Sequence, residues 1–304
     1  MIDTHPKKNS LNSLISVKDF TREKVMHYIK KTEKYENTSN NSKNLKTMIN
    51  LFYEPSTRTS CSFHTAMLKM GGNVIEIADN SSAKKGESLE DTIKTVSNYG
   101  DVIVLRHPEK GAAERAAKVA TVPIINAGDG NGEHPTQALL DIYTIYKELK
   151  KDLEKDNIIV TFIGDLKNSR TVHSLIHLLN LFNVTYIFIS PPHLDLPLEM
   201  MEESLPLEMM EEILPLSLEE ALKITDVVYV TRIQKERIQT DQPHQPICLT
   251  KELLSEANKD LIIMHPLPRQ EELPPEIDDD PRAVYFKQVA NGVSMRMAIL
   301  DELI

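Results

Sequence analysis

Cysteine is nearly absent from the sequence, and long apolar runs are missing altogether. Of the 304 residues two are cysteines, Cys61 and Cys248, which are too few for a disulfide framework and do not match the spacing of metal ligands. No apolar stretch approaches the ~20 residues of a membrane span, and the opening MIDTHPKKNS has no apolar core of a signal peptide. These absences predict a cytoplasmic protein with two free thiols.

An excess of positive charge is also missing. The chain has 35 Lys and Arg residues against 45 Asp and Glu residues, a formal net charge of -10. Nucleic acid is therefore excluded as the main partner, because a phosphate backbone needs a broadly basic face. Small anions are not excluded, since they need only a local pocket of positive charge.

Glycine is scarce and unevenly placed. All ten glycines lie between Gly71 and Gly164 except Gly292. Any turn between residues 165 and 291 that needs a positive φ must therefore use Asn, Asp or another residue.

Short apolar runs alternate with longer amphipathic ones from residue 45 onward, which predicts βαβ units and parallel sheets. In the first half, strands are expected at Thr47–Tyr53, Asn73–Ile77, Asp101–Arg106 and Val122–Asn126, and helices at Thr57–Met70, Leu89–Tyr99, Ala112–Val119 and Pro135–Lys150. The pattern then restarts, with strands at Asn157–Ile163, Val184–Ile189, Asp226–Val230 and Leu261–Met264, and a helix near Arg170–Leu181.

A final amphipathic helix at Val293–Leu303 is expected to return to the first domain. The predicted fold is therefore α/β, with two doubly wound parallel-sheet domains joined by interdomain helices. We place residues 1–135 and 292–304 in one domain and residues 136–291 in the other.

A tandem duplication interrupts the second domain. LPLEMMEES at Leu196–Ser204 is followed by LPLEMMEEI at Leu205–Ile213. Because proline interrupts a helix, we expect short helical turns with Met and Leu on one face and Glu outward. A stacked repeat fold needs at least ~3 units, so the segment is interpreted as a surface excursion rather than a docking motif.

The first polar loop follows the strand at 47–53. The stretch PSTRTSCS at 55–62 places five hydroxyl groups around Arg58. Ligands bind at the carboxyl ends of strands in α/β sheets, where helix N-termini present free N–H groups. A single hydroxyl at Ser56 or Thr57 would suit a helix cap, whereas hydroxyls with a guanidinium suit a phosphate or carboxylate. The loop alone favours neither interpretation.

Two further loops precede predicted helices. AKKGESLEDT at 83–92 has two lysines and a possible capping box of Ser88 and Asp91; alone, it favours solvated lysines. NAGDGNGEHPTQ at 126–137 packs three glycines into five residues before His134 and Gln137 at a helix start. Such glycines allow close approach of backbone to a ligand, so this loop is a stronger candidate for a site.

The second half supplies three more loops. GDLKNSRTVHS at 164–174 has one glycine, which excludes a GxGxxG dinucleotide site, and His173 and His177 lack the Glu of a zinc-binding HExxH helix. TRIQKER at 231–237 and the stiff loop HPLPR at 265–269 also follow strands. Six polar loops at strand ends, collectively cationic, predict one ligand site.

Together these loops resemble aspartate carbamoyltransferase. The motifs keep the family's order: F-x-E-x-S-T-R-T at Phe52–Thr59, K-K-G-E-S at Lys84–Ser88, R-H-P at Arg106–Pro108, N-A-G-D-G-x-x-x-H-P-T-Q at Asn126–Gln137, G-D-L-K-x-x-R-T-V-H-S at Gly164–Ser174, R-x-Q-K-E-R at Arg232–Arg237 and H-P-L-P-R at His265–Arg269. The resemblance runs from about Leu45 to the C-terminus. It is most similar to the carbamoyltransferase domain of animal-type multifunctional pyrimidine enzymes.

The resemblance implies transfer of the carbamoyl group of carbamoyl phosphate to the α-amine of L-aspartate, without a metal or organic cofactor. It implies that the phosphate is held by Ser56, Thr57, Arg58 and Thr59, the carbamoyl oxygen by Thr59, Arg106 and His134, and the carbamoyl NH2 by Gln137 and the backbone carbonyls of Pro266 and Leu267. Aspartate is expected at Lys85, Arg170, Arg232 and Gln234. Thr59, Lys85, Arg106 and His134 are the expected catalytic residues.

The resemblance also implies an assembly and a motion. Ser81 and Lys85 are expected to enter the carbamoyl phosphate site of a neighbouring subunit, which makes a homotrimer with shared sites. Glu54 is expected to pair with Arg170 and Arg237 when the domains close.

Two alternatives to this function stay open. One is a catalytically silent scaffold that binds carbamoyl phosphate, suggested by Ser169 in place of the family's glycine, by a shortened loop after Arg237 and by the duplication. The other is a carbamoyltransferase for another amino acid. Ornithine is disfavoured, because the Arg232-x-Gln234 pocket would repel its cationic side chain and Pro266 stands where that enzyme has a cysteine.

Overall fold

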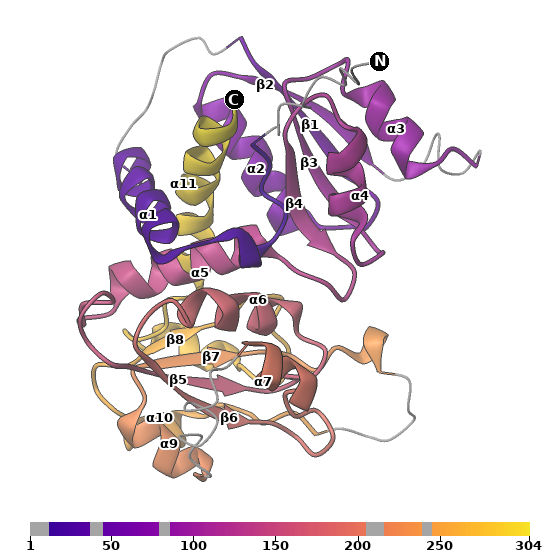
Figure 1. Cartoon of the computed structure of the whole chain (residues 1–304). Helices are drawn as coiled ribbons and strands as arrows, with labels where there is room; N and C mark the ends of the chain where they lie inside the picture. The colour runs from indigo at the N-terminus through magenta and orange to yellow at the C-terminus, as the bar shows by residue number, and fades with distance from the viewer. Residues whose placement is uncertain (1–11, 37–44, 79–85, 205–215, 239–244) are drawn as a thin grey trace, which may run out of the picture.

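The structure is a computed structural model that describes residues 12–36, 45–78, 86–204, 216–238 and 245–304. Within these ranges the chain forms two separate sheets of four parallel strands each (Figure 1). No helix in the described ranges is both long enough and apolar enough to cross a membrane.

The first sheet is built from short strands that are largely buried in β1, β3 and β4, as expected of a parallel sheet, whereas the edge strand β2 is partly exposed. Its strands, in the order β2-β1-β3-β4, are β2 Asn73–Ala78, β1 Thr47–Phe52, β3 Val102–His107 and β4 Ile124–Asp129. Helices α3 Leu89–Val96 and α4 Ala112–Val119 cover one face, and α2 Thr57–Lys69 lies on the other with the C-terminal helix (Figure 1).

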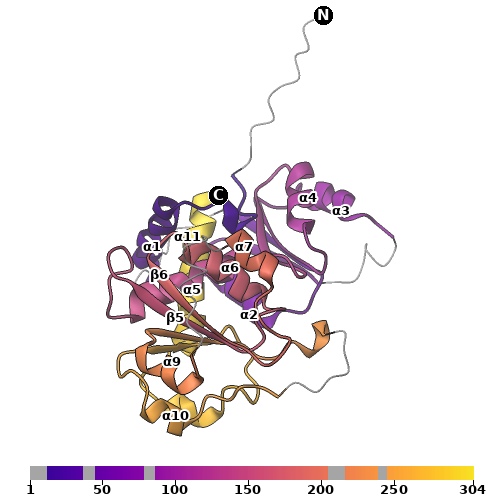
Figure 2. The same ribbon diagram turned by 60° about the horizontal axis from the view of Figure 1, so that its bottom comes forward.

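The second sheet repeats this plan in the order β6-β5-β7-β8. Its strands are β5 Ile158–Ile163, β6 Val184–Ile189, β7 Val227–Val230 and β8 Ile262–Met264. Helix α6 Arg170–Leu179 packs on the face toward the first domain, and α9 Leu218–Ile224 and α10 Lys251–Ser255 lie on the opposite face (Figure 2).

Three helices link the two domains: α5 Pro135–Glu148 lies between the sheets, α11 Tyr285–Leu303 packs on it, and α1 Arg22–Glu36 packs on α11. Helix α11 packs against α1, α2 and α5, and α5 packs against α6 (Figure 1). One apolar core therefore continues from Met48 in the first sheet through Leu139 of α5 to Phe162 in the second. This packing holds the two sheets in a defined relation.

Both sheets reverse their strand order at a corresponding place. From the first strand of each sheet, the chain moves to one neighbour and then returns to the other side, between β1 and β3 and between β5 and β7. Loops diverge at such a switch point and leave a crevice at the carboxyl ends of the strands. The loops after β1, β3, β5 and β7, which flank the two switch points, carry four of the polar motifs, at residues 55–62, 106–108, 164–174 and 231–237.

The predicted fold, with two parallel α/β units and interdomain helices, is confirmed. Most predicted elements agree to within one or two residues, and Ala112–Val119 and Val184–Ile189 agree in full. The expected strand at Val122–Asn126 instead runs to Asp129 and includes Gly128. The expected helix at Leu89–Tyr99 ends at Val96, where the Ser97 hydroxyl donates to the Ile93 carbonyl.

The C-terminal helix was predicted to start at Val293 but begins at Tyr285. Its first turns bury the polar residues Gln288 and Asn291, which disguises the apolar face that sequence periodicity relies on. Helix α11 is continuous through residues 291 and 292, so the domain boundary placed there, like the one at residue 135, stays a prediction.

Helix α1 was not predicted, although its sequence carries a helical signal. Val25, Met26, Tyr28, Ile29 and Thr32 are buried along one face, a spacing typical of an amphipathic helix.

The duplication is described only in its first copy. Residues 198–204 form the short helix α7 after Pro197, and Met200 and Met201 pack against the core. This agrees with the expected short helical turn and apolar Met face. The second copy, Leu205–Ile213, lies outside the described residues.

Candidate active site

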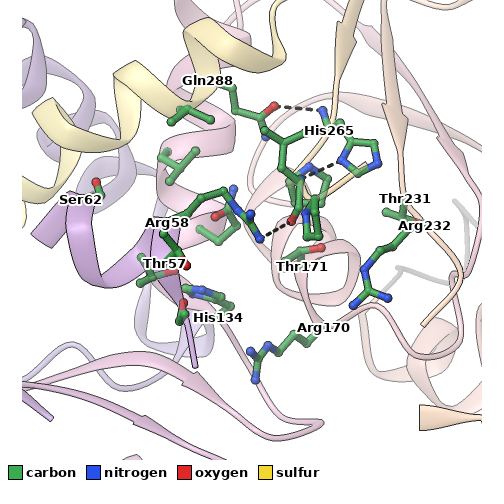
Figure 3. A pocket seen from close by; sticks show the side chains of 18 of the residues that line it. Thr57, Arg58, Ser62, His134, Arg170, Thr171, Thr231, Arg232, His265 and Gln288 are labelled. Atoms are coloured by element: carbon green, nitrogen blue, oxygen red, sulfur yellow. Dashed lines mark hydrogen bonds between the residues drawn. The ribbon is translucent and has the colours of Figure 1, made fainter. Parts of the chain in front are cut away.

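The two switch points face each other across a cavity of about 310 Å³. Nearly every site residue predicted from sequence lines it: Ser56, Thr57, Arg58, Thr59, Arg106, His134, Gln137, Arg170, Arg232, Gln234, Arg237, Pro266 and Leu267. Figure 3 shows Thr57 and Arg58 at the start of one helix with His134 beside them, and Arg170 and Arg232 on other elements. Ser81 and Lys85 lie outside the described residues.

The N-terminus of α2 is not capped by a hydroxyl. Ser56 occupies the N-cap position but its side chain makes no cap hydrogen bond, whereas Ser88 caps α3 by accepting from the Asp91 N–H. The two loops therefore differ, and the cap interpretation of Ser56 is wrong. The uncapped end of α2 leaves backbone N–H groups and the Ser56 hydroxyl for a ligand.

Two other hydroxyls of this segment, those of Ser60 and Ser62, have structural partners. The Ser60 hydroxyl accepts a hydrogen bond from Asn50 at 3.1 Å, and the Ser62 hydroxyl accepts one from the buried Arg296 at 3.0 Å. Arg58 extends across the cavity and donates to the Leu267 carbonyl at 3.1 Å (Figure 3). Burial and the nearby Arg232 lower the pKa of Arg58.

Arg106 ends β3 beside Glu54, which follows β1. Its Nε lies 3.2 Å from Glu54 Oε2, without the alignment of a hydrogen bond. Burial lowers the pKa of Arg106, and the Glu54 carboxylate opposes that effect. Arg106 is thus held at the cavity by an ion pair.

Arg170 is the first residue of α6 and is buried. Its guanidinium donates to the Gly130 carbonyl at 2.7 Å and lies 3.9 Å from Glu54. Burial, with Arg106 and Arg237 nearby, lowers the pKa of Arg170 to about 9. Such crowding of cations is costly unless an anion binds among them.

The glycine loop determines where Arg170 can lie. Gly128 has φ +113, and a Cβ atom at this position would come 2.9 Å from the Arg170 guanidinium carbon. Gly130 supplies the carbonyl that both Arg170 and Arg237 contact. The glycines therefore allow the guanidinium groups of the second domain to approach the backbone of the first.

The unusual Ser169 does not distort Arg170. Ser169 has φ -89 at the N-cap of α6, and the positive-φ residues other than glycine in the described ranges are His193 and Leu267. No left-handed turn is needed at Ser169 or Asn168. The glycine-poor half of the chain uses a histidine and a leucine for such turns, rather than Asn or Asp.

His134 is buried at the start of α5, where its backbone N–H donates to the Ser174 hydroxyl at 2.9 Å. Burial lowers its pKa well below the usual value, and the cations Arg170, Arg106 and Arg296 lower it further. A neutral imidazole has one N–H to donate to a ligand and no charge to repel the arginines.

Arg232 precedes the short 3-10 helix Lys235–Arg237 that follows β7, and Arg237 is its last residue. Arg232 forms a two-pronged ion pair with Glu236, which raises its pKa. Arg237 donates to the Asn168 carbonyl at 2.8 Å and to the Gly130 carbonyl at 3.3 Å. Glu54 lies 3.9 Å from Arg170, one of its two expected partners, and also pairs with Arg106, which was not expected. The pairing with Arg237 stays a prediction for the closed state.

Several lining residues had no role in the sequence interpretation. Arg296 and Gln288 of α11 line the cavity and are buried. A charged residue between Met295 and Met297 on a buried helix face was the available signal for Arg296. The cavity is lined by six arginines and by Glu236 as the single carboxylate among its lining residues, so it suits a ligand with several negative charges.

Comparisons with known proteins agree with this geometry. Residues 12–147 match the family model "Aspartate/ornithine carbamoyltransferase, carbamoyl-P binding domain", and residues 156–303 match its "Asp/Orn binding domain" counterpart. The chain is 46% identical to an aspartate carbamoyltransferase catalytic subunit of Archaeoglobus fulgidus, covering 96% of this chain and 99% of the other. It is equally identical to the multifunctional protein CAD of Squalus acanthias over 94% of this chain and 13% of CAD.

Solved structures are similar over the same extent. Aspartate transcarbamoylase from Trypanosoma cruzi in complex with carbamoyl aspartate and phosphate has a TM-score of 0.85 and 38% identity, covering 99% of this chain and 98% of the other. The catalytic subunit from M. jannaschii has a TM-score of 0.82 and 42% identity, covering 96% and 97%. Two matching family models and relatives alike along almost the entire chain establish that this protein belongs to the aspartate/ornithine carbamoyltransferase family.

Proposed function

We propose that the protein transfers the carbamoyl group of carbamoyl phosphate to the α-amine of L-aspartate, giving N-carbamoyl-L-aspartate and phosphate, an early step of pyrimidine biosynthesis. The observation that carries the proposal is the arginine-lined cavity between two switch points. One wall has an uncapped helix end and Arg58 for a phosphate, and the other has Arg170 and Arg232 for a dicarboxylate.

The reaction needs no nucleophile from the protein, because the substrate amine attacks the carbamoyl carbon. The protein must hold two anions together and stabilise the negative charge that develops on the carbamoyl oxygen. We assign Thr59, Arg106 and His134 to that oxygen. The neutral state of His134, caused by its burial and cationic neighbours, supports a role as N–H donor.

On the donor side, Ser56, Thr57, Arg58 and Thr59 are assigned to the phosphate. Arg58 donates to the Leu267 carbonyl in this structure, and that same carbonyl is assigned, with Pro266 and Gln137, to the carbamoyl NH2. Arg58 therefore has to exchange the carbonyl for the phosphate when the donor binds. When Arg58 binds the phosphate, the Leu267 carbonyl is freed to accept a hydrogen bond from the carbamoyl NH2.

On the acceptor side, Arg170, Arg232, Gln234 and Lys85 are assigned to aspartate. Arg232 is paired with Glu236, so a substrate carboxylate has to compete with an internal one. Closure of the domains would bring Glu54 toward Arg237, which already contacts the backbone of both domains.

The direct test supplies carbamoyl phosphate with aspartate or ornithine and measures the carbamoylated product. We expect carbamoyl aspartate from the wild-type protein. A product formed from ornithine or another amino acid alone would instead support a transferase of different specificity.

A substitution of His134 distinguishes an active enzyme from a silent binding scaffold. If the wild-type protein turns over its substrates and His134→Ala does not, although the variant still binds phosphate, the scaffold hypothesis is excluded. No turnover by the wild type, with carbamoyl phosphate bound, would support it.

We also propose a cytoplasmic homotrimer in which Ser81 and Lys85 complete the carbamoyl phosphate site of a neighbouring subunit. Lys85→Ala and Arg58→Ala proteins are each expected to be inactive, because each lacks a cation for the substrate. Mixed after gentle dissociation, they should regain activity, since a mixed trimer contains some sites with both residues intact. Mixed trimers verified by mass spectrometry that show no recovered activity would contradict shared sites.

Gly128→Ala tests whether the absence of a side chain at residue 128 fixes the position of the Arg170 guanidinium. The new Cβ meets the guanidinium at 2.9 Å, so we expect KM for aspartate to rise by roughly 30-fold, equivalent to about 2 kcal/mol. Gly111→Ala is the matched control: its φ is +81, similarly unfavourable for alanine, but nothing lies within 4 Å of the Cβ. Equal effects of the two variants on KM would contradict displacement of Arg170.

A further inference from the structure

A buried carboxylate with no assigned role contacts two residues that line the cavity, Gln137 and Gln288. Asp141 is on α5, one helical turn after Gln137, and its exposed fraction is 0%. It accepts three hydrogen bonds: from Gln137 Nε2 at 2.8 Å, from Gln288 Nε2 at 2.6 Å and from the Tyr229 hydroxyl at 2.7 Å. The donors come from α5, α11 and β7, so Asp141 joins the elements that surround the cavity.

The bond to Gln137 determines which end of its amide serves the cavity. A carboxylate accepts hydrogen bonds and has none to donate, so the NH2 of Gln137 must face Asp141. Gln137 also lines the cavity, and its carbonyl oxygen is the group left for a ligand. With a neutral amide in place of Asp141, the Gln137 amide could turn over and present its NH2 instead.

The same reasoning applies to Gln288. Its Nε2 donates to Asp141, and its Oε1 accepts from the backbone N–H of His265 at 3.0 Å. His265 Nδ1 in turn accepts from the Leu267 N–H at 2.8 Å. The carboxylate is therefore connected to both sets of NH2 acceptors: the Gln137 side chain and the carbonyls of the HPLPR loop.

A purely structural function would not require a carboxylate here. Burial raises the pKa of Asp141 to about 6, although Tyr229, Gln288, Gln137 and the charge of Arg296 all act to lower it. Burying the charged Asp141 carboxylate at this position therefore costs free energy of folding. A carboxylate differs from an amide of the same shape because it can only accept hydrogen bonds, whereas the amide can also donate them.

We propose that Asp141 is a positioning residue for recognition of the carbamoyl NH2. By accepting from Gln137 and Gln288, it makes Gln137 present a carbonyl oxygen to the cavity and so favours a donor that ends in NH2 over one that ends in CH3. The proposal rests on the proposed function, since it assumes that the carbamoyl group binds at Gln137.

The test uses two stable phosphonates that differ in one group. Phosphonoacetamide carries a terminal NH2, and 2-oxopropylphosphonate carries CH3 in its place. We expect the wild-type protein to bind the amide at least about tenfold more tightly by calorimetry at pH 8, as one or two hydrogen bonds would give. In Asp141→Asn this preference should fall to about threefold or less, while the affinity for 2-oxopropylphosphonate changes little.

Two further variants separate positioning from general damage. Asp141→Asn introduced into Gln137→Ala should change the preference much less than Asp141→Asn alone, because the route through Gln137 is already lost and only the one through Gln288 remains. Asp226→Asn is the matched control: Asp226 is also buried, but it binds Lys151 and the Ile159 N–H away from the cavity, so its preference should equal that of the wild type.

Two results would overturn the proposal. If Asp141→Asn weakens both phosphonates equally, or lowers the unfolding temperature without changing the preference, Asp141 acts only on the fold. If neither phosphonate binds the wild-type protein, the carbamoyl phosphate site itself is misassigned, and the proposed function fails with it.

Discussion

Replacing Arg106 with alanine should lower kcat by about a thousand-fold, the upper range for loss of one donor to a developing oxyanion. Arg106 is partly buried near the end of β3 and lies closer to Glu54 than Arg170 does. Its loss would remove a charged donor from the carbamoyl oxygen. Steady-state kinetics with saturating carbamoyl phosphate and aspartate would measure the effect.

Loss of Arg106 also leaves Glu54 with a single distant partner, Arg170 at 3.9 Å. Arg106→Ala combined with Glu54→Gln removes both charges and should recover stability without recovering activity. Arg115→Ala serves as the control, because Arg115 is half-exposed and pairs with Glu90 and Glu109 away from the cavity. If the double variant regains most of the wild-type kcat, Arg106 supports the fold and does not stabilise the oxyanion.

Arg170→Ala should raise KM for aspartate by about a thousand-fold, since losing a buried partner of a carboxylate costs about 4 kcal/mol. Arg170 sits at the start of α6 with its guanidinium between the Gly130 carbonyl and Glu54. Arg170→Lys should recover little, because an ammonium cannot form the two parallel bonds of a guanidinium.

The affinity for phosphonoacetamide reports on the donor site alone. It should change by less than threefold in Arg170→Ala, since the phosphate is assigned to the α2 end of the cavity. A comparable loss for phosphonoacetamide and aspartate would place Arg170 at the carbamoyl group or would indicate that it holds the two domains together.

The sequence was sufficient to predict the fold because each parallel strand is a short buried run followed by a helix. β6 at Val184–Ile189 was predicted in full, because a short apolar run between helical segments can be recognised from neighbouring residues alone. The start of α11 was not, because Gln288 and Asn291 are polar yet buried. Their burial depends on partners about 147 residues away, namely Asp141 and Thr144.

The site was predictable to the extent that its residues follow strand ends. Arg58 and Arg106 could be expected to meet, and likewise Arg170 and Arg232, because each pair follows neighbouring parallel strands of one sheet, whose carboxyl ends share one edge. Arg296 and Asp141 lie inside helices, where the pattern indicates packing. The partners Ser62 of Arg296 and Gln288 of Asp141 become evident only when α11 is placed beside α2 and α5.

The concentration of arginines has a consequence for how the protein balances stability against activity. Arg106, Arg170 and Arg237 repel one another through a buried region, and the pKa of each is lowered. Folding therefore has to overcome this repulsion before any substrate arrives, and the substrates relieve it when they bind. Mutations that neutralise these residues can make the protein more robust while they remove its activity. The same arginines therefore lower the stability of the empty protein and raise its affinity for anionic substrates.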